Sequence, residues 1–260
     1  MEKDNTVGEH VFTNKISARE NGECFFEDVT FPYDQALGPL RQSSVINAHL
    51  INFNWWPANF NGNIPDSAEP KVILIMEGSA HFSASNGETR ELKPGDVLVQ
   101  ADLKGSAIEV RSGIYGPFRA AHIYLNKGSA TKENILDLPK SDRSLPYVRN
   151  ISGDDGKSHF QDGVLEYYLK EDSSLATKDI LLTKFQYVYA ASDLRFDWHN
   201  APQRQIVLPL TGGTQGENSD GSRRLVPAGG VYFGEDITGE GHITRSIDNG
   251  IRFSIFAHLA

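Results

Sequence analysis

An internal repeat with a spacing of 134 residues, the distance from Gly78 to Gly212, constrains the fold more than any other feature of the chain. Segments 71–108 and 205–242 share nine identities at this spacing, where ordinary amino-acid usage would give roughly two or three by chance. Four of the nine are glycines, which mark turns with positive φ or close backbone approach. Shared turns imply a shared strand order, so we expect two halves with one fold; a coincidence of glycine-rich loops is the alternative. The nine pairs are Leu74/Leu208, Gly78/Gly212, Ser85/Ser219, Gly87/Gly221, Arg90/Arg224, Gly95/Gly229, Val97/Val231, Asp102/Asp236 and Gly105/Gly239.

The apolar residues come in short runs that are typical of β-strands. The runs are rich in β-branched and aromatic residues, are bounded by Gly, Pro, Asn or Asp, and are too short for most helices. The chain is therefore predicted to be all-β, with two β-domains at 1–140 and 141–260 that join near the polar, proline-containing stretch 139–146. Examples of the runs are Val72–Met76, Val97–Val99, Ala120–Leu125, Ile180–Thr183, Ile206–Leu210, Val231–Phe233 and Ile251–Phe256.

Charge and composition argue against several classes of partner. The chain has 25 Lys+Arg against 34 Asp+Glu, a formal net charge of −9, and no basic run longer than Arg223-Arg224, so we expect no nucleic-acid partner. No 18 consecutive residues are apolar, and the polar N-terminus leads into no apolar segment, so we expect no membrane span and no signal peptide. A single cysteine, Cys24, excludes an internal disulfide and favours a buried thiol. Together these features predict a cytoplasmic protein.

Both halves resemble the cupin superfamily, whose members are small antiparallel barrels of the jelly-roll type. Residues 93–99 of the first half, Lys-Pro-Gly-Asp-Val-Leu-Val, are similar to the family's Pro-Gly-Asp-Val turn and strand. Residues 199–205 of the second half, His-Asn-Ala-Pro-Gln-Arg-Gln, are followed after six residues by Gly212 and resemble the family's first motif. Gly239-Glu240-Gly241-His242 is similar to its second motif. The run His-x-Ala-Pro-x-Arg-Gln also resembles a group of small single-domain cupins. The resemblance implies a bicupin, two tandem cupin barrels related by the internal repeat.

The chain departs from the family pattern at residues that carry chemistry. In the second half, Ala201 stands where the family has its second histidine, and Gln205 stands where it has a glutamate. In the first half, no corresponding position is an imidazole or a carboxylate. The resemblance therefore implies that the first barrel has no cupin-type site and serves as structure, or as a wall or lid for its partner. The corresponding first-half positions are Pro65, Ser67, Lys71 and Ile108.

Strand geometry predicts a site inside the second barrel. Side chains alternate along a strand, so His199, Ala201 and Gln205 share one face, and His242 can converge on them from another strand. His199, Gln205 and His242 could ligate a divalent transition metal (Zn, Fe, Mn, Ni or Cu). Without an anionic ligand, a metal-free pocket with hydrogen-bonded histidines is an equal alternative. In both cases His199 and His242 are the candidate catalytic groups, as metal ligands or as general acid and base.

Further side chains are candidates for binding a substrate in this pocket. Thr244 shares the strand parity of His242 and should face the cavity, whereas Asp197 could orient His199, bind substrate at the barrel mouth, or be a surface acid. For the two tyrosines of strand 180–190, core packing is the alternative. Arg204 has the opposite parity to Gln205 and is expected to form an outward ion pair with Glu235 or Asp236. The substrate-binding candidates are Gln205, Asp197, Tyr187, Tyr189 and Thr244.

Three functions remain open at this level. The first is an enzyme that acts on a small organic molecule in the second barrel, for which the resemblance implies isomerase, lyase, cyclase or dioxygenase chemistry. The second is a non-catalytic protein that binds or senses a metabolite without a metal. A purely structural bicupin is the third, and it is less favoured because the chain lacks the length and secretory signal of that group. We expect a monomer that mimics a cupin dimer, or a homodimer.

Overall fold

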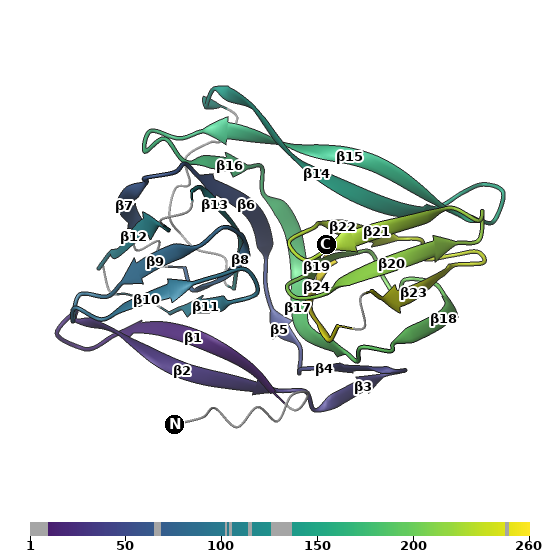
Figure 1. Cartoon of the computed structure of the whole chain (residues 1–260), viewed down its shortest axis with the longest axis horizontal. Helices are drawn as coiled ribbons and strands as arrows, with labels where there is room; N and C mark the ends of the chain where they lie inside the picture. The colour runs from purple at the N-terminus through teal and green to yellow at the C-terminus, as the bar shows by residue number, and fades with distance from the viewer. Residues whose placement is uncertain are drawn as a thin grey trace.

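The computed structural model describes residues 10–64, 69–101, 103, 106–113, 116–125, 137–247 and 250–260. The elements in these ranges, β1 to β24, are strands, which confirms the all-β prediction. In each half, part of one large sheet faces a small four-stranded sheet, as in a jelly roll (Figure 1). Within the described ranges, no helix has the length and apolarity needed to cross a lipid bilayer.

The first half packs its part of the large sheet, in the order β2-β1-β11-β8-β13-β6, against the small sheet β10-β9-β12-β7. β1 runs parallel to β11, and the other pairs within this half are antiparallel. The strands are β1 (His10–Ala18), β2 (Cys24–Pro32), β6 (Leu50–Trp56), β7 (Asn61–Ile64), β8 (Lys71–Glu77), β9 (Ala80–Ser83), β10 (Thr89–Leu92), β11 (Val97–Gln100), β12 (Ile108–Ser112) and β13 (Phe118–Tyr124).

The second half has the order β15-β14-β22-β19-β24-β17 in the large sheet and β21-β20-β23-β18 in the small sheet. Here β14 runs parallel to β22. The strands are β14 (Lys140–Ser152), β15 (Ser158–Leu169), β17 (Ile180–Ala190), β18 (Arg195–His199), β19 (Gln205–Pro209), β20 (Gly213–Asn218), β21 (Arg223–Pro227), β22 (Tyr232–Glu235), β23 (His242–Ser246) and β24 (Arg252–Leu259).

Several strands of the two halves begin at the spacing of the internal repeat. β8 begins at Lys71 and β19 at Gln205, 134 residues later, and the same spacing separates the first residues of β12 and β23, Ile108 and His242. The single parallel pair of each half also occupies the same place in the strand order. That the two halves are tandem repeats of one barrel stays a prediction.

Strand pairing joins the halves into one 16-stranded sheet. β6 of the first half pairs with β16 (Leu175–Thr177) and with the start of β17. In return, β4 (Leu40–Gln42) and β5 (Ile46–Asn47) pair with β17, and β3 (Gln35–Leu37) completes a hairpin with β4. Figure 1 shows β3 and β4 reaching from the first half to the lower edge of the second. Residues 35–47 therefore extend a sheet of the second half, although they precede residue 140.

The interior of the first barrel is filled with apolar side chains. Phe82, Ile108 and Leu98 are fully buried there, and Cys24 is a buried free thiol, as expected. Each large side chain of this kind contributes about 1.5–3 kcal/mol by its burial. Of the four positions that correspond to cupin ligands, Ile108 lies in this core and Lys71 is buried, whereas Pro65 and Ser67 lie outside the described residues. A second apolar core lies between the two halves and contains Phe53, Phe185 and Tyr187.

Candidate functional site

The second barrel encloses a cavity whose wall combines polar groups with apolar side chains. The space open to the centre of a water-sized sphere is about 60 Å³, enough for a few waters or part of a small ligand, since one water needs roughly 10–15 Å³ on this measure. Leu37 and Leu40 of the β3–β4 hairpin lie in the wall, so the first half helps to close this cavity. The lining residues central to the site are His199, Gln205, Tyr232, His242, Thr244 and Arg252.

His199 and His242 face each other across neighbouring strands. They are paired in the β18–β23 register, and their ring centroids lie 4.3 Å apart. Phe196 stacks on the other side of His199, with a centroid distance of 3.9 Å. Strand pairing therefore brings together the two histidines that the sequence motifs predicted as partners.

The His199 ring is held in one tautomer. Its Nδ1 lies 2.6 Å from the backbone carbonyl oxygen of Asp197, and because a carbonyl can only accept, Nδ1 carries the proton and donates it. Burial, and then the nearby His242 ring, lower the pKa of His199 to about 4. The imidazole is therefore neutral at physiological pH and leaves the lone pair of Nε2 for a ligand.

His242 forms a buried dyad with Asp236. Its Nδ1 lies 2.6 Å from Oδ2 of Asp236, and both residues are buried, Asp236 completely. The same carboxylate oxygen accepts a hydrogen bond from Oγ of Ser158 at 3.1 Å. A carboxylate that accepts from Nδ1–H fixes the tautomer, orients the ring and stabilises the imidazolium that forms when Nε2 takes a proton. The sequence indicates Asp236 only as a candidate partner of Arg204, because strand parity does not predict the contact with His242.

The loop that carries Asp236 and ends at His242 is attached to the β14–β15 hairpin. Oγ of Ser152 donates to the carbonyl oxygen of Thr238 at 2.9 Å and accepts from the Thr238 backbone N–H at 3.2 Å. The Glu240 N–H donates to the Gly156 carbonyl in the hairpin turn. The amide of Asn200 donates to the Thr238 carbonyl from the other side, at 2.9 Å. These bonds determine where the dyad lies in the barrel.

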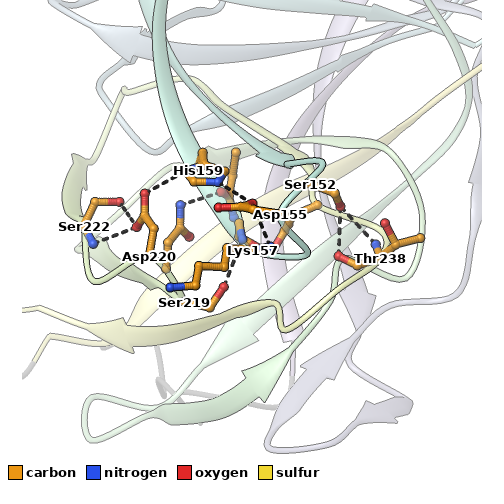
Figure 2. A network of polar contacts seen from close by, with 12 residues as sticks. Ser152, Asp155, Lys157, His159, Ser219, Asp220, Ser222 and Thr238 are labelled. Atoms are coloured by element: carbon orange, nitrogen blue, oxygen red, sulfur yellow. Dashed lines mark hydrogen bonds and ion pairs between the residues drawn. The ribbon is translucent and has the colours of Figure 1, made fainter.

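A polar network around His159 holds the turn of the β14–β15 hairpin in place. Figure 2 shows His159 between Asp155 and Asp220, with ring nitrogens 2.9 Å from each carboxylate. The hydrogen bond to Asp155 raises the pKa of His159. Asp220 also accepts from the hydroxyl and backbone N–H of Ser222. The network links the β14–β15 turn to the β20–β21 turn beneath the loop of Asp236.

Close backbone approach at Gly241 brings that loop against β18. Gly241 has φ +74°, a conformation that side chains with a β-carbon rarely adopt. A β-carbon there would overlap the backbone carbonyl oxygen of His199. The glycine of the Gly-x-Gly-His sequence thus allows His242 to start its strand directly beside His199.

The other predicted site residues divide into two groups. Gln205 and Thr244 lie in the cavity wall, and the buried Oε1 of Gln205 has no hydrogen-bond partner in the described part of the chain. The Asp197 carboxylate instead points to solvent, 3.6 Å from Arg195, and only the backbone of Asp197 serves the site. Arg204 forms the expected outward ion pair, with its Nε 2.7 Å from Glu235.

Tyr187 and Tyr189 do not line the cavity, which corrects the expectation for both. The two residues share one face of β17, as strand parity requires, but that face turns toward the core between the halves. Tyr187 stacks on Phe31 with a centroid distance of 5.2 Å, and Tyr189 packs beside Tyr33 at 5.9 Å. Both faces of β17 are buried in apolar surroundings, so parity alone does not say which one faces the barrel interior.

The donors present do not fit a resident divalent metal well. Nε2 of His199, Nε2 of His242 and Oε1 of Gln205 are two neutral imidazoles and a weak neutral oxygen. The nearest buried carboxylate, Asp236, is hydrogen-bonded to Nδ1 of His242 and is therefore not free to ligate a metal. Within the described ranges, no group of three or more His, Cys, Asp or Glu side chains is placed to hold an ion. These donors therefore favour a site that works without a resident metal.

Comparison with known proteins gives similar structures but no close relative. No family model matches the chain, and no curated protein matches it. A cupin 2 conserved barrel domain protein from Leptotrichia buccalis is 9% identical, with a TM-score of 0.43 over 89% of this chain and 92% of that chain. A putative glyoxylate-induced protein from Pseudomonas aeruginosa is 12% identical, with a TM-score of 0.42 over 87% and 84%. A mutant oxalate decarboxylase from Bacillus subtilis is 13% identical, with a TM-score of 0.36 over 87% and 75%. At these TM-scores the similarity carries no functional information.

Proposed function

We propose that the chain is a two-barrel cupin that binds a small organic molecule in its second barrel and moves a proton on it, with His242 as the catalytic acid and base. The observation that carries the proposal is the buried Asp236–His242 dyad in a cavity wall. Because Asp236 engages Nδ1, Nε2 of His242 is the nitrogen left for the substrate. The cupin assignment is supported by the motifs at 199–205 and 239–242 and by the jelly-roll strand order.

The proposed step is removal of a proton from a carbon next to a carbonyl group. Nε2 of His242 takes the proton, the electron pair of the C–H bond moves into the enolate, and Asp236 stabilises the imidazolium. The imidazolium then returns the proton to a different carbon, which is isomerisation, or the enolate expels a leaving group, which is a lyase reaction. His199 stays neutral and, through Nε2, accepts a hydrogen bond from a substrate hydroxyl.

The first half has a structural role in this proposal. Leu37 and Leu40 help to close the cavity, and the pairing of β6 with β16 and β17 joins the two barrels within one chain. This arrangement supports a monomer in which two barrels pair as subunits of a dimer would.

The test is solvent deuterium exchange on a panel of small hydroxy acids, hydroxy ketones and oxo acids. Incubation with the wild-type protein in D2O should place deuterium next to the carbonyl of at least one compound, as measured by mass spectrometry. His242→Gln should slow this exchange by roughly 10²–10⁴-fold, which is the usual contribution of a positioned acid or base. His81→Gln, the same change at a histidine of β9 in the first half, is the control and should exchange at the wild-type rate.

Two results would contradict the proposal. A compound that binds in the cavity, with no exchange on any member of the panel, would favour the non-catalytic metabolite-binding alternative. Exchange that survives in His242→Gln would remove His242 from the reaction.

A further inference from the structure

In the described part of the chain, the cavity wall contains a buried arginine without a counter-charge. Arg252 begins β24, is 2% exposed, and lines the cavity of the second barrel. Among the residues that the structure describes, its Nε has no hydrogen-bond partner and no carboxylate lies within ion-pair distance of its guanidinium. The other arginine of the wall, Arg224, differs in both respects, because its side chain is 43% exposed and lies 3.5 Å from Asp162.

An arginine in this position is costly unless something binds it. Removing a cation from water without a partner carries a large desolvation penalty, and buried charges in proteins are normally paired. Burial lowers the pKa of Arg252 to about 10, so the guanidinium is still charged at physiological pH. A cation that the fold keeps charged and unpaired in a cavity wall is suited to an anion from outside the chain.

The polar groups of the cavity are separated along the barrel. Gln205 pairs with His258 on β24, and Arg252 lies further along the same strand, on the face shared by Phe256. From His258 to Arg252 the strand backbone runs about 20 Å at about 3.3 Å per residue, and the side chains of Gln205 and Arg252 reach the wall of the same cavity. One end of the cavity therefore carries acceptors, Nε2 of His199 and Oε1 of Gln205, and the other end carries the guanidinium donors.

The surroundings of Arg252 also limit the kind of anion. Apolar side chains, including Leu40, Val207 and Phe256, cover much of the wall between the two ends. Ser254, between Arg252 and Phe256 on the same strand, has an enclosed hydroxyl without a hydrogen-bond partner in the described residues. One guanidinium beside one hydroxyl matches a planar monoanion better than a phosphate dianion, because a carboxylate accepts two parallel N–H bonds from an arginine.

We propose that the cavity takes a small hydroxy carboxylate with an apolar body between its two polar ends, whose carboxylate binds Arg252 and whose hydroxyl donates to Gln205 or His199. This assignment specifies the substrate class of the proposed proton transfer and rests on that function. It uses Arg252 as a binding residue, which the sequence motifs did not indicate.

The test compares carboxylates with their neutral amides. 4-Hydroxyphenylacetate and 3-(4-hydroxyphenyl)propionate, which carry the hydroxyl and the carboxylate at opposite ends of an apolar body, and their amides are titrated into the wild-type protein, Arg252→Met and Arg224→Met by calorimetry and thermal shift. The wild type should bind at least one acid tenfold or more tightly than its amide. Arg252→Met should bind both forms equally, and its melting temperature without ligand should exceed that of the wild type, because the unpaired charge is gone. Arg224→Met removes a cation that already has a partner and should keep the preference for the acid.

The outcomes separate this inference from the function on which it rests. Equal binding of acids and amides by the wild type, or an unchanged preference in Arg252→Met, would overturn the carboxylate assignment even if deuterium exchange occurs. A lower melting temperature of Arg252→Met would likewise show that the guanidinium has an internal partner. His242→Gln should keep the preference for the acid, because Arg252 is unchanged in this variant. The binding preference therefore tests the carboxylate assignment, and deuterium exchange tests the catalytic role of His242.

Discussion

Replacing Asp236 by asparagine should slow deuterium exchange by roughly 10²–10⁴-fold while leaving the protein folded. The carboxylate accepts the Nδ1–H of His242 at 2.6 Å, and an asparagine can instead present its amide N–H to Nδ1. The proton of the neutral imidazole then moves to Nε2, which can no longer act as a base. The rate is measured by mass spectrometry on the best compound of the panel, and the tautomer by ¹⁵N NMR of the labelled imidazole.

The neighbouring carboxylate provides a matched control. Glu235 points away from the cavity and pairs with Arg149 and Arg204. Burial raises the pKa of Glu235, but the two guanidiniums outweigh burial and bring the pKa below its usual value. Glu235→Gln should therefore lower the melting temperature but leave the tautomer of His242 unchanged and the exchange rate within a few-fold of wild type. Equal losses of exchange in Asp236→Asn and Glu235→Gln would show that the dyad has no particular role.

Replacing Gly241 by alanine should cost both stability and activity. The positive φ alone makes a β-carbon unfavourable by about 1–3 kcal/mol, and the overlap with the His199 carbonyl forces the loop or β18 to move. At about 2–4 °C per kcal/mol for a chain of this size, the melting temperature should fall by several degrees. Because the same movement separates His199 from His242, exchange should fall more steeply than the loss of folded protein explains.

Gly87→Ala measures the loss of stability that the positive φ causes by itself, without a steric overlap. Gly87 has φ +88°, but a β-carbon there meets no atom within 4 Å, and the residue lies in the first half. This variant should lose a comparable share of stability from the conformation alone and keep the wild-type exchange rate of its folded fraction. A Gly241→Ala protein with the stability and exchange of Gly87→Ala would contradict the role of close approach at this loop.

Strand positions and the His199–His242 pair could be predicted from sequence because both depend on simple periodicities. Glycine turns at a constant spacing of 134 residues define equivalent strands in the two halves, as the starts of β8 and β19 illustrate. Alternation along strands places side chains of equal parity on one face, which brings Gln205, His242 and Thr244 into one cavity wall. These rules need no knowledge of loops or of distant contacts.

The remaining features of the site depend on interactions without such a periodicity. Asp236 reaches His242 through a loop whose path is determined by bonds to Ser152 and Gly156, and strand parity says nothing about a loop. Leu40 arrives from the other half of the chain. Arg252 is a charged residue at a strand end, a pattern typical of solvent exposure, and only packing of the complete barrel buries it.

The most direct measurement is a crystal structure of the protein with the panel compound that binds most tightly. The account predicts the ligand inside the second barrel, with its reacting carbon about 3–3.5 Å from Nε2 of His242 and its carboxylate against Arg252. Electron density for the ligand outside this cavity, or imidazole rings of His199 and His242 that are separated and turned to solvent, would contradict it.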